Sequence, residues 1–135
     1  MATKVLDSWA LIAFFEDEPA ASDVENLLQQ AADEKHKLLM SVVSWGEVYY
    51  NTMREVSQAA AEQTAQEIAA LPIDIIGVDD DLVLARQAAI FKAKHRMAYA
   101  DCFAAALAKQ KNAELVTGDP EFRAVEKEIK ISWLK

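Results

Sequence analysis

The chain has 135 residues, of which 53% are hydrophobic, and its 14 basic and 22 acidic side chains give a net charge of −8. This length suits one domain, residues 1–135, with its own core, and no apolar run approaches the roughly 20 residues that cross a bilayer. The negative charge argues against non-specific binding to nucleic acid, but it does not exclude a nuclease whose acids are neutralised by bound cations.

Short apolar strands alternate with helices along the chain. The hydrophobic pattern predicts strands over residues 4–7, 37–43, 73–78, 114–117 and 129–134. It predicts helices over residues 8–15, 20–32 (begun by Pro19), 44–54, 57–70, 80–94 (capped by Asp79) and 99–109, and a short one from Pro120. This alternation indicates an α/β fold, a three-layer α/β/α sandwich around a mostly parallel twisted sheet of about five strands.

Three acidic residues follow predicted strands. Asp7 closes the first strand, Glu47 lies in the helix after the second, and Asp119 follows the fourth. Each has an ordinary structural explanation, since Asp7 and Asp119 can cap helices and Glu47 can complete a capping box with Ser44. Ligands of parallel sheets bind beyond the carboxyl ends of the strands. We therefore expect these acids to lie near one edge of the sheet.

Asp101 is the only charged residue between Met97 and Ala108. A helix that is apolar all round is buried, and a buried carboxylate needs a charge partner or a proton. The dipole at the helix N-terminus could stabilise Asp101, but a functional role explains it better.

Together the four acids favour a metal site. Converging carboxylates repel one another and raise their own pKa values unless a cation neutralises them. Oxygen ligands without histidine or cysteine suit Mg²⁺ or Mn²⁺, and such ions assist phosphodiester hydrolysis. The sequence therefore predicts that Asp7, Glu47, Asp101 and Asp119 hold Mg²⁺ or Mn²⁺.

Other site chemistries have little support. The chain has neither a glycine-rich phosphate loop nor a nucleophile elbow. His36 and His95 lie in polar stretches, where exposed surface residues are expected. Cys102 is the only cysteine, which excludes an internal disulfide, and its apolar neighbours predict a buried thiol in a protein of the reducing cytoplasm.

Four stretches in order resemble the PIN-domain nucleases, and within them the VapC-type toxins of bacterial toxin–antitoxin pairs. They are Val5-Leu6-Asp7-Ser8-Trp9-Ala10, Ser44-Trp45-Gly46-Glu47-Val48, Tyr99-Ala100-Asp101-Cys102-Phe103-Ala104-Ala105-Ala106-Leu107-Ala108 and Leu115-Val116-Thr117-Gly118-Asp119-Pro120-Glu121-Phe122. Each motif is weak alone, whereas the ordered set is specific and covers the chain from end to end. Lys94-His95-Arg96-Met97-Ala98 departs from the Gly and Ser or Pro often found before the third acid.

The resemblance implies a metal-dependent endoribonuclease, acting as a homodimeric toxin that an antitoxin inhibits. It implies that Asp7 and Asp101 bind the metal directly, and that Glu47 and Asp119 complete the pocket, partly through water. Ser8 and Thr117 match hydroxyl positions that orient the acids or a phosphate.

The mechanism expected is hydrolysis by a water that attacks the phosphate in line and expels the ribose 3′-oxygen. One or two Mg²⁺ ions would polarise the phosphate and activate the water, and Glu47 or Asp119 would accept its proton. Lys92, Lys94 and Arg96 could hold RNA phosphates at the mouth of the pocket, or could instead stabilise a helix C-terminus. Arg54 and Arg123 are weaker candidates. Transfer, ribosomal and messenger RNA all remain open as substrates.

The first helix carries a large apolar load in Trp9, Phe14 and Phe15. Most of it is expected in the core, and the excess could form a dimer face or a groove for an antitoxin helix. Three alternatives stand beside the nuclease. A receiver-like module would need paired acids after the first strand, and a haloacid-type phosphatase would need a second Asp two residues after Asp7. A catalytically silent PIN-fold interaction protein is the third.

Overall fold

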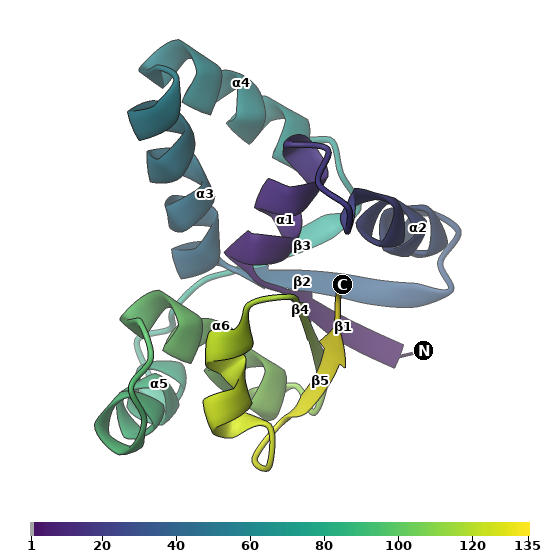
Figure 1. Cartoon of the computed structure of the whole chain (residues 1–135). Helices are drawn as coiled ribbons and strands as arrows, with labels where there is room; N and C mark the ends of the chain where they lie inside the picture. Colours follow the sequence, from purple (N-terminus) through teal and green to yellow (C-terminus); the bar gives the residue numbers. More distant parts are fainter. Residues whose placement is uncertain (1) are drawn as a thin grey trace.

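Five parallel strands form a single sheet in the order β3-β2-β1-β4-β5 in the computed structural model, which describes residues 2–135 (Figure 1). The strands are β1 (Ala2–Leu6), β2 (His36–Ser41), β3 (Ile73–Ile76), β4 (Glu114–Thr117) and β5 (Lys130–Trp133). The helices are α1 (Ser8–Phe15), α2 (Ala21–Ala32), α3 (Val42–Glu55), α4 (Gln58–Ala69), α5 (Val83–Lys94), α6 (Tyr99–Gln110) and the 3-10 helix η1 (Pro120–Val125).

Alternate residues of the strands serve two separate cores. Val5, Leu39 and Leu115 face one side of the sheet, where they pack with apolar residues of α5, α6 and η1. Leu6 and Val116 face the other side, with residues of α1, α2, α3 and α4. Side chains of a strand point alternately to its two faces, so one sheet supports both layers, as Figure 1 shows. The predicted three-layer α/β/α sandwich is confirmed.

The α3–α4 pair extends away from the sheet as a helical hairpin (Figure 1). Its two helices contact each other, and α3 also contacts α1, α6, β2 and β3. Within residues 2–135, no helix has both the length and the apolar character needed to cross a membrane.

Helix α3 begins earlier than the sequence predicted. Ser41 ends β2 and is the N-cap, since its hydroxyl accepts a hydrogen bond from Val43 N at 3.1 Å. The capping box predicted for Ser44 and Glu47 is therefore wrong, because both residues lie inside the helix. Apolar residues on both sides of Ser41, at 38–40 and 42–43, concealed the change from strand to helix, and Ser44 offered a second possible cap.

Helix α5 begins later than predicted, at Val83 rather than at residue 80. Asp79 is not its cap. Asp81 instead accepts a hydrogen bond from Val83 N at 3.1 Å, and Leu82 precedes the helix with a left-handed φ of 66°. Three consecutive aspartates offered three possible caps, and the sequence does not separate them.

Two smaller predictions are also wrong. Pro19 lies in the turn before α2, which starts only at Ala21. His36 is buried, not exposed, because it opens β2 and its Nε2 lies 3.0 Å from the carbonyl oxygen of Leu27 in α2. The polar neighbours of His36 belong to the turn before the strand, and they hid its burial.

Strand register brings three chain segments to one edge of the sheet. Leu6 at the end of β1 is paired with Met40 of β2 and with Val116 of β4. Because the strands are parallel and in register, Asp7 follows at the level of Ser41 and Thr117. The segments carrying the predicted acids therefore leave the sheet side by side.

Candidate metal centre

Asp7 is almost fully buried between α1 and β4. One carboxylate oxygen accepts a hydrogen bond from Ala10 N at 2.9 Å, which caps α1. The other accepts a hydrogen bond from the Thr117 hydroxyl at 2.5 Å. Asp7 is therefore both the helix cap and a member of the acidic cluster, so the two explanations of this residue are compatible.

Glu47 comes from the second turn of α3 and reaches back to α1. The hydroxyl of Ser8 donates to its Oε1 at 2.7 Å, and the Tyr50 hydroxyl lies 3.4 Å from its Oε2. Because Ser8 directly follows Asp7 in the chain, its hydrogen bond holds Glu47 beside Asp7. Tyr50 was not identified from the sequence.

Asp119 closes the cluster from the turn after β4. Its Oδ1 accepts a hydrogen bond from Glu121 N at 2.9 Å, which caps η1, and Pro120 takes the first helical position. The N–H of Asp119 donates to the Thr117 hydroxyl at 3.0 Å. Since the same hydroxyl donates to Asp7, Thr117 connects the two carboxylates.

Asp101 lies in the first turn of α6, a helix whose residues 101–108 are all buried. Its carboxylate comes close to Asp119 and Glu121: one oxygen of each of the three residues lies within 4.8 Å of the other two. Glu121 was not among the site residues predicted from the sequence. Its position two residues after Asp119, with Phe122 buried between η1 and the sheet, could have suggested that it faces the cluster.

Burial and mutual repulsion raise the proton affinity of two of these acids. The pKa of Asp7 rises to about 7, mainly because the group is buried, while the hydrogen bonds from Thr117 and Ala10 counteract part of the rise. The pKa of Asp101 rises to about 8, again mainly through burial and then through the negative charges of Glu47, Asp119 and Glu121. Without cations, the site holds protons near neutral pH.

This chemistry fits a divalent cation. The cluster offers only carboxylate oxygens, which Mg²⁺ and Mn²⁺ prefer, and no lysine or arginine forms an ion pair with these acids among the described residues. A cation at the centre would replace the protons and remove the repulsion between the carboxylates. Asp7 and Asp101, the most buried of the acids, would gain most from it.

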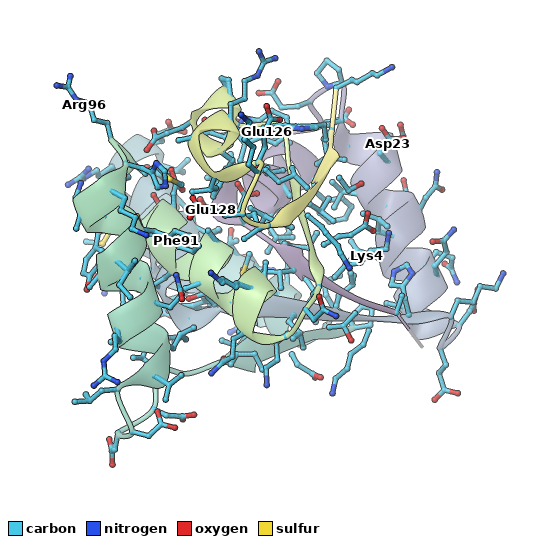
Figure 2. The ribbon with its side chains drawn as sticks, turned by 90° about the horizontal axis from the view of Figure 1, so that it is seen from below. Lys4, Asp23, Phe91, Arg96, Glu126 and Glu128 are labelled. Atoms are coloured by element: carbon cyan, nitrogen blue, oxygen red, sulfur yellow. The ribbon has the colours of Figure 1, made fainter. Side chains whose placement is uncertain are left out.

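The basic residues before α6 have different positions. The ammonium group of Lys92 donates to the carbonyl oxygen of Met97 at 2.7 Å, so it closes the loop between α5 and α6. Arg96 points outward from the end of this loop (Figure 2), and Lys94 is exposed. Lys92 therefore has a structural role, but in the loop after α5 rather than at the helix C-terminus, where the alternative predicted it. RNA binding by the exposed Lys94 and Arg96 stays a prediction.

The remaining reactive side chains lie outside the cluster. Cys102 is a free, buried thiol, as predicted. His95, predicted to be exposed, is partly buried, and its Nε2 lies 2.7 Å from a carboxylate oxygen of Glu128.

The family profile of the PIN domain matches residues 4–128. The chain therefore belongs to the PIN-domain family, which is the class that its sheet and acidic edge define. A receiver-like module and a haloacid-type phosphatase are thereby set aside. Comparison with curated protein sequences gives no significant match.

Several solved structures share the fold over nearly the whole chain. VapBC2 from Rickettsia felis, bound to a promoter DNA fragment, has a TM-score of 0.73 and 14% identity, with 98% of this chain and 99% of that chain covered. DNA-bound VapBC from Salmonella typhimurium has a TM-score of 0.72 and 14% identity, with 98% of both chains covered. VapC20 from Mycobacterium tuberculosis, described as a sarcin–ricin loop cleaving toxin, has a TM-score of 0.70 and 16% identity, with 90% and 94% covered.

Proposed function

We propose that this chain is a metal-dependent endoribonuclease, with residues 1–135 acting as one nuclease domain and serving as the toxin of a toxin–antitoxin pair. The observation that carries the proposal is the meeting of Asp101, Asp119 and Glu121 oxygens within 4.8 Å, next to Asp7 and Glu47. Membership of the PIN family supports nuclease chemistry. The similarity to VapC20, described as a sarcin–ricin loop cleaving toxin, supports RNA as the substrate.

In this proposal each acid has a defined task. Asp7 and Asp101 bind Mg²⁺ or Mn²⁺ directly, and Glu47 and Asp119 complete the surroundings of the cation. A bound divalent cation supplies the positive charge that attracts phosphate oxygens and increases the acidity of nearby water. Thr117 fixes the rotamer of Asp7 through its hydroxyl, and Ser8 does the same for Glu47.

The reaction is hydrolysis of a phosphodiester bond. Water attacks the phosphorus in line, its proton passes to Glu47 or Asp119, and the ribose 3′-oxygen leaves. Neither carboxylate has an ion-pair partner among the described residues, so both have acceptor oxygens available to the attacking water. We assign contacts with the RNA backbone to Lys94 and Arg96, whose side chains are exposed before α6.

The antitoxin is proposed to bind the groove between α1 and the α3–α4 hairpin. This groove has a volume of about 360 Å³, and its apolar lining includes Ile12, Phe15 and Val56. Glu16 and Glu55 also line it, and partial desolvation together with the charge of Glu55 raises the pKa of Glu16. An amphipathic helix with an apolar side and a basic residue complements such a groove. A homodimer is part of the same proposal.

The test of the nuclease is cleavage by purified chain of labelled transfer RNA, ribosomal stem-loops and unstructured RNA, with and without Mn²⁺. We expect metal-dependent cleavage that falls at least about 100-fold in Asp7→Asn, because direct metal ligands dominate such sites. Asp23→Asn is the matched control, since Asp23 is an exposed acid of α2 (Figure 2). Equal cleavage by wild type and Asp7→Asn would refute the assignment.

A further inference from the structure

One peptide group at the start of α6 is held at both ends by side chains from other segments. The ammonium group of Lys92 donates to the carbonyl oxygen of Met97, and the N–H of Ala98 donates to a carboxylate oxygen of Glu121. This carbonyl and this N–H belong to the same peptide bond. A cation therefore binds the negative end of one peptide dipole, and an anion binds its positive end.

Helix α6 depends on this arrangement because its own N-cap residue offers no side-chain acceptor. The N-cap is Ala98, whose methyl side chain makes no capping hydrogen bond. In a capping box, a glutamate inside the helix accepts a hydrogen bond from the N–H of the N-cap residue. Here Glu121, which lies 23 positions further along the chain in η1, accepts that hydrogen bond.

The two hydrogen bonds to this peptide group, from Lys92 and to Glu121, join α6 to η1, the segments that carry Asp101 and Asp119. We call this pair of hydrogen bonds the clamp. Asp101 is in the first turn of α6, three residues after Ala98. Asp119 caps η1, and Glu121 lies in the first turn of that helix. Any movement of the Met97–Ala98 peptide group would shift Asp101 relative to Asp119. The side chain of Met97 is buried in the core, which limits movement of the peptide group.

We propose that Glu121 and Lys92 are positioning residues, which clamp the Met97–Ala98 peptide group and so set the separation of Asp101 and Asp119 for one divalent cation. The inference rests on the proposed function, since this separation matters only if the two acids share a cation. Glu121 acts through its hydrogen-bond acceptor. Its proximity to the acids also allows direct ligation, and the variants below distinguish the two roles.

The first measurement is the affinity of the full chain for Mn²⁺ alone, by titration calorimetry, together with the melting temperature. Glu121→Gln keeps an acceptor for Ala98 N–H, whereas Glu121→Ala removes it. We expect Glu121→Ala to weaken Mn²⁺ binding by about 10- to 100-fold, as loss of residues that orient metal ligands does. Glu121→Gln should stay within about 3-fold of wild type, as should Glu126→Ala, which removes an exposed acid at the end of η1 (Figure 2).

Lys92→Met tests the other end of the clamp and keeps the apolar stem of the side chain. We expect a loss of Mn²⁺ affinity comparable to that of Glu121→Ala, although Lys92 itself is a cation and its removal alone would favour cation binding. Because both residues hold one peptide group, the double variant should be no weaker than the poorer single variant. Lys92→Met carries the test if Glu121→Ala does not fold.

Each contrary result has a distinct meaning. Equal losses in Glu121→Gln and Glu121→Ala would make Glu121 a metal ligand and overturn the clamp. A lower melting temperature with unchanged Mn²⁺ affinity would leave only a structural role and overturn it too. Both of these results overturn the clamp only. The proposed function still stands if the wild type binds Mn²⁺ and Asp101→Asn does not. If the wild type binds no Mn²⁺, the proposed function fails first, and the clamp fails with it.

Discussion

Two hydroxyl side chains set the orientation of the acids at the edge of the sheet. Thr117 donates to Asp7, and Ser8 donates to Glu47. A carboxylate has about four lone-pair positions, and Asp7 uses two of them for Thr117 and Ala10. Capping a helix therefore leaves Asp7 with acceptor capacity for a cation, and the same holds for Asp119, which caps η1 through one oxygen.

Gly118 is required by the close approach of an aromatic ring. A Cβ atom at this position would lie 2.2–2.6 Å from three atoms of the Trp9 indole. Gly118 separates Thr117 from Asp119, so pressure on this backbone would reach the acidic cluster directly. The sequence shows Gly118 only as an isolated glycine, and Trp9 lies 109 positions earlier in the chain.

Gly118→Ala should therefore destabilise the protein by about 1–3 kcal/mol, because the indole or the Gly118–Asp119 backbone must move. Urea unfolding measures this loss. In a Trp9→Ala background the same substitution should cost less than about 0.5 kcal/mol, since the obstacle is gone. Gly46→Ala is the control: the space around this helical glycine is open among the described residues, so alanine should be neutral or stabilising there. Equal costs of Gly118→Ala in both backgrounds would contradict the explanation.

At the scale of elements, the α3–α4 hairpin separates the proposed partner groove from the acidic edge. Helix α3 supplies Glu47 to the cluster near its start and Val56, just after its end, to the groove. A helix rises about 1.5 Å per residue, so Glu47 and Val56, nine positions apart, are separated by about 13 Å along the axis of α3. A partner in the groove can thus bind without occupying the metal position.

Val56→Asp should weaken binding of the proposed antitoxin at least about 10-fold, because it introduces a charge into an apolar contact that already has two acids beside it. The side chain of Val56 is 72% exposed, so the melting temperature should change little. Binding of the purified antitoxin by calorimetry checks this. Val78→Asp, at an exposed position after β3, should leave the affinity unchanged. If both variants bind with wild-type affinity, the partner uses another surface.

At the scale of the whole molecule, the acidic cluster opposes folding at neutral pH. The pKa values of Asp7 and Asp101 rise from 3.8 to about 7 and about 8 in the folded chain. Between about pH 4 and pH 8 the folded state binds more protons than the unfolded state, so the free energy of unfolding falls as the pH increases. The stabilisation from these protons is complete below about pH 4 and is lost above about pH 8.

Metal-free protein should therefore lose roughly 6 kcal/mol of unfolding free energy from these two groups between pH 5 and pH 8, since about 1.4 kcal/mol is lost per pH unit for each group over most of this range. Urea unfolding in chelator at several pH values measures the slope. Asp101→Asn should flatten it, and Asp23→Asn should not. Mn²⁺ should stabilise the wild type more at pH 8 than at pH 5, because cations and protons compete for the same oxygens. A metal-free slope that is identical in wild type and Asp101→Asn would contradict this account.

The periodicity of the sequence was sufficient for the layers of the fold and for the acidic edge. Apolar strands alternating with helices dictate a covered parallel sheet, and parallel strands bring their carboxyl ends to one edge. Asp7, Asp101 and Asp119 were found in this way because each stands where an apolar run ends or where a charge interrupts one. Local spacing also identified the caps formed by Asp7 and Asp119.

Only the tertiary structure decided which of several equivalent local choices was used. Ser41 and Ser44 are both acceptable caps, and pairing of β2 with β3 selected Ser41, because the strand runs to that residue, opposite Ile76. Glu121, Lys92 and Gly118 act through partners 23, 5 and 109 positions away, namely Ala98, Met97 and Trp9. A single sequence records residue types and spacings, whereas contacts between distant segments arise only when the two cores pack. The sequence alone is enough to predict the acidic residues, whereas the contacts that hold them near one another are set by the tertiary structure.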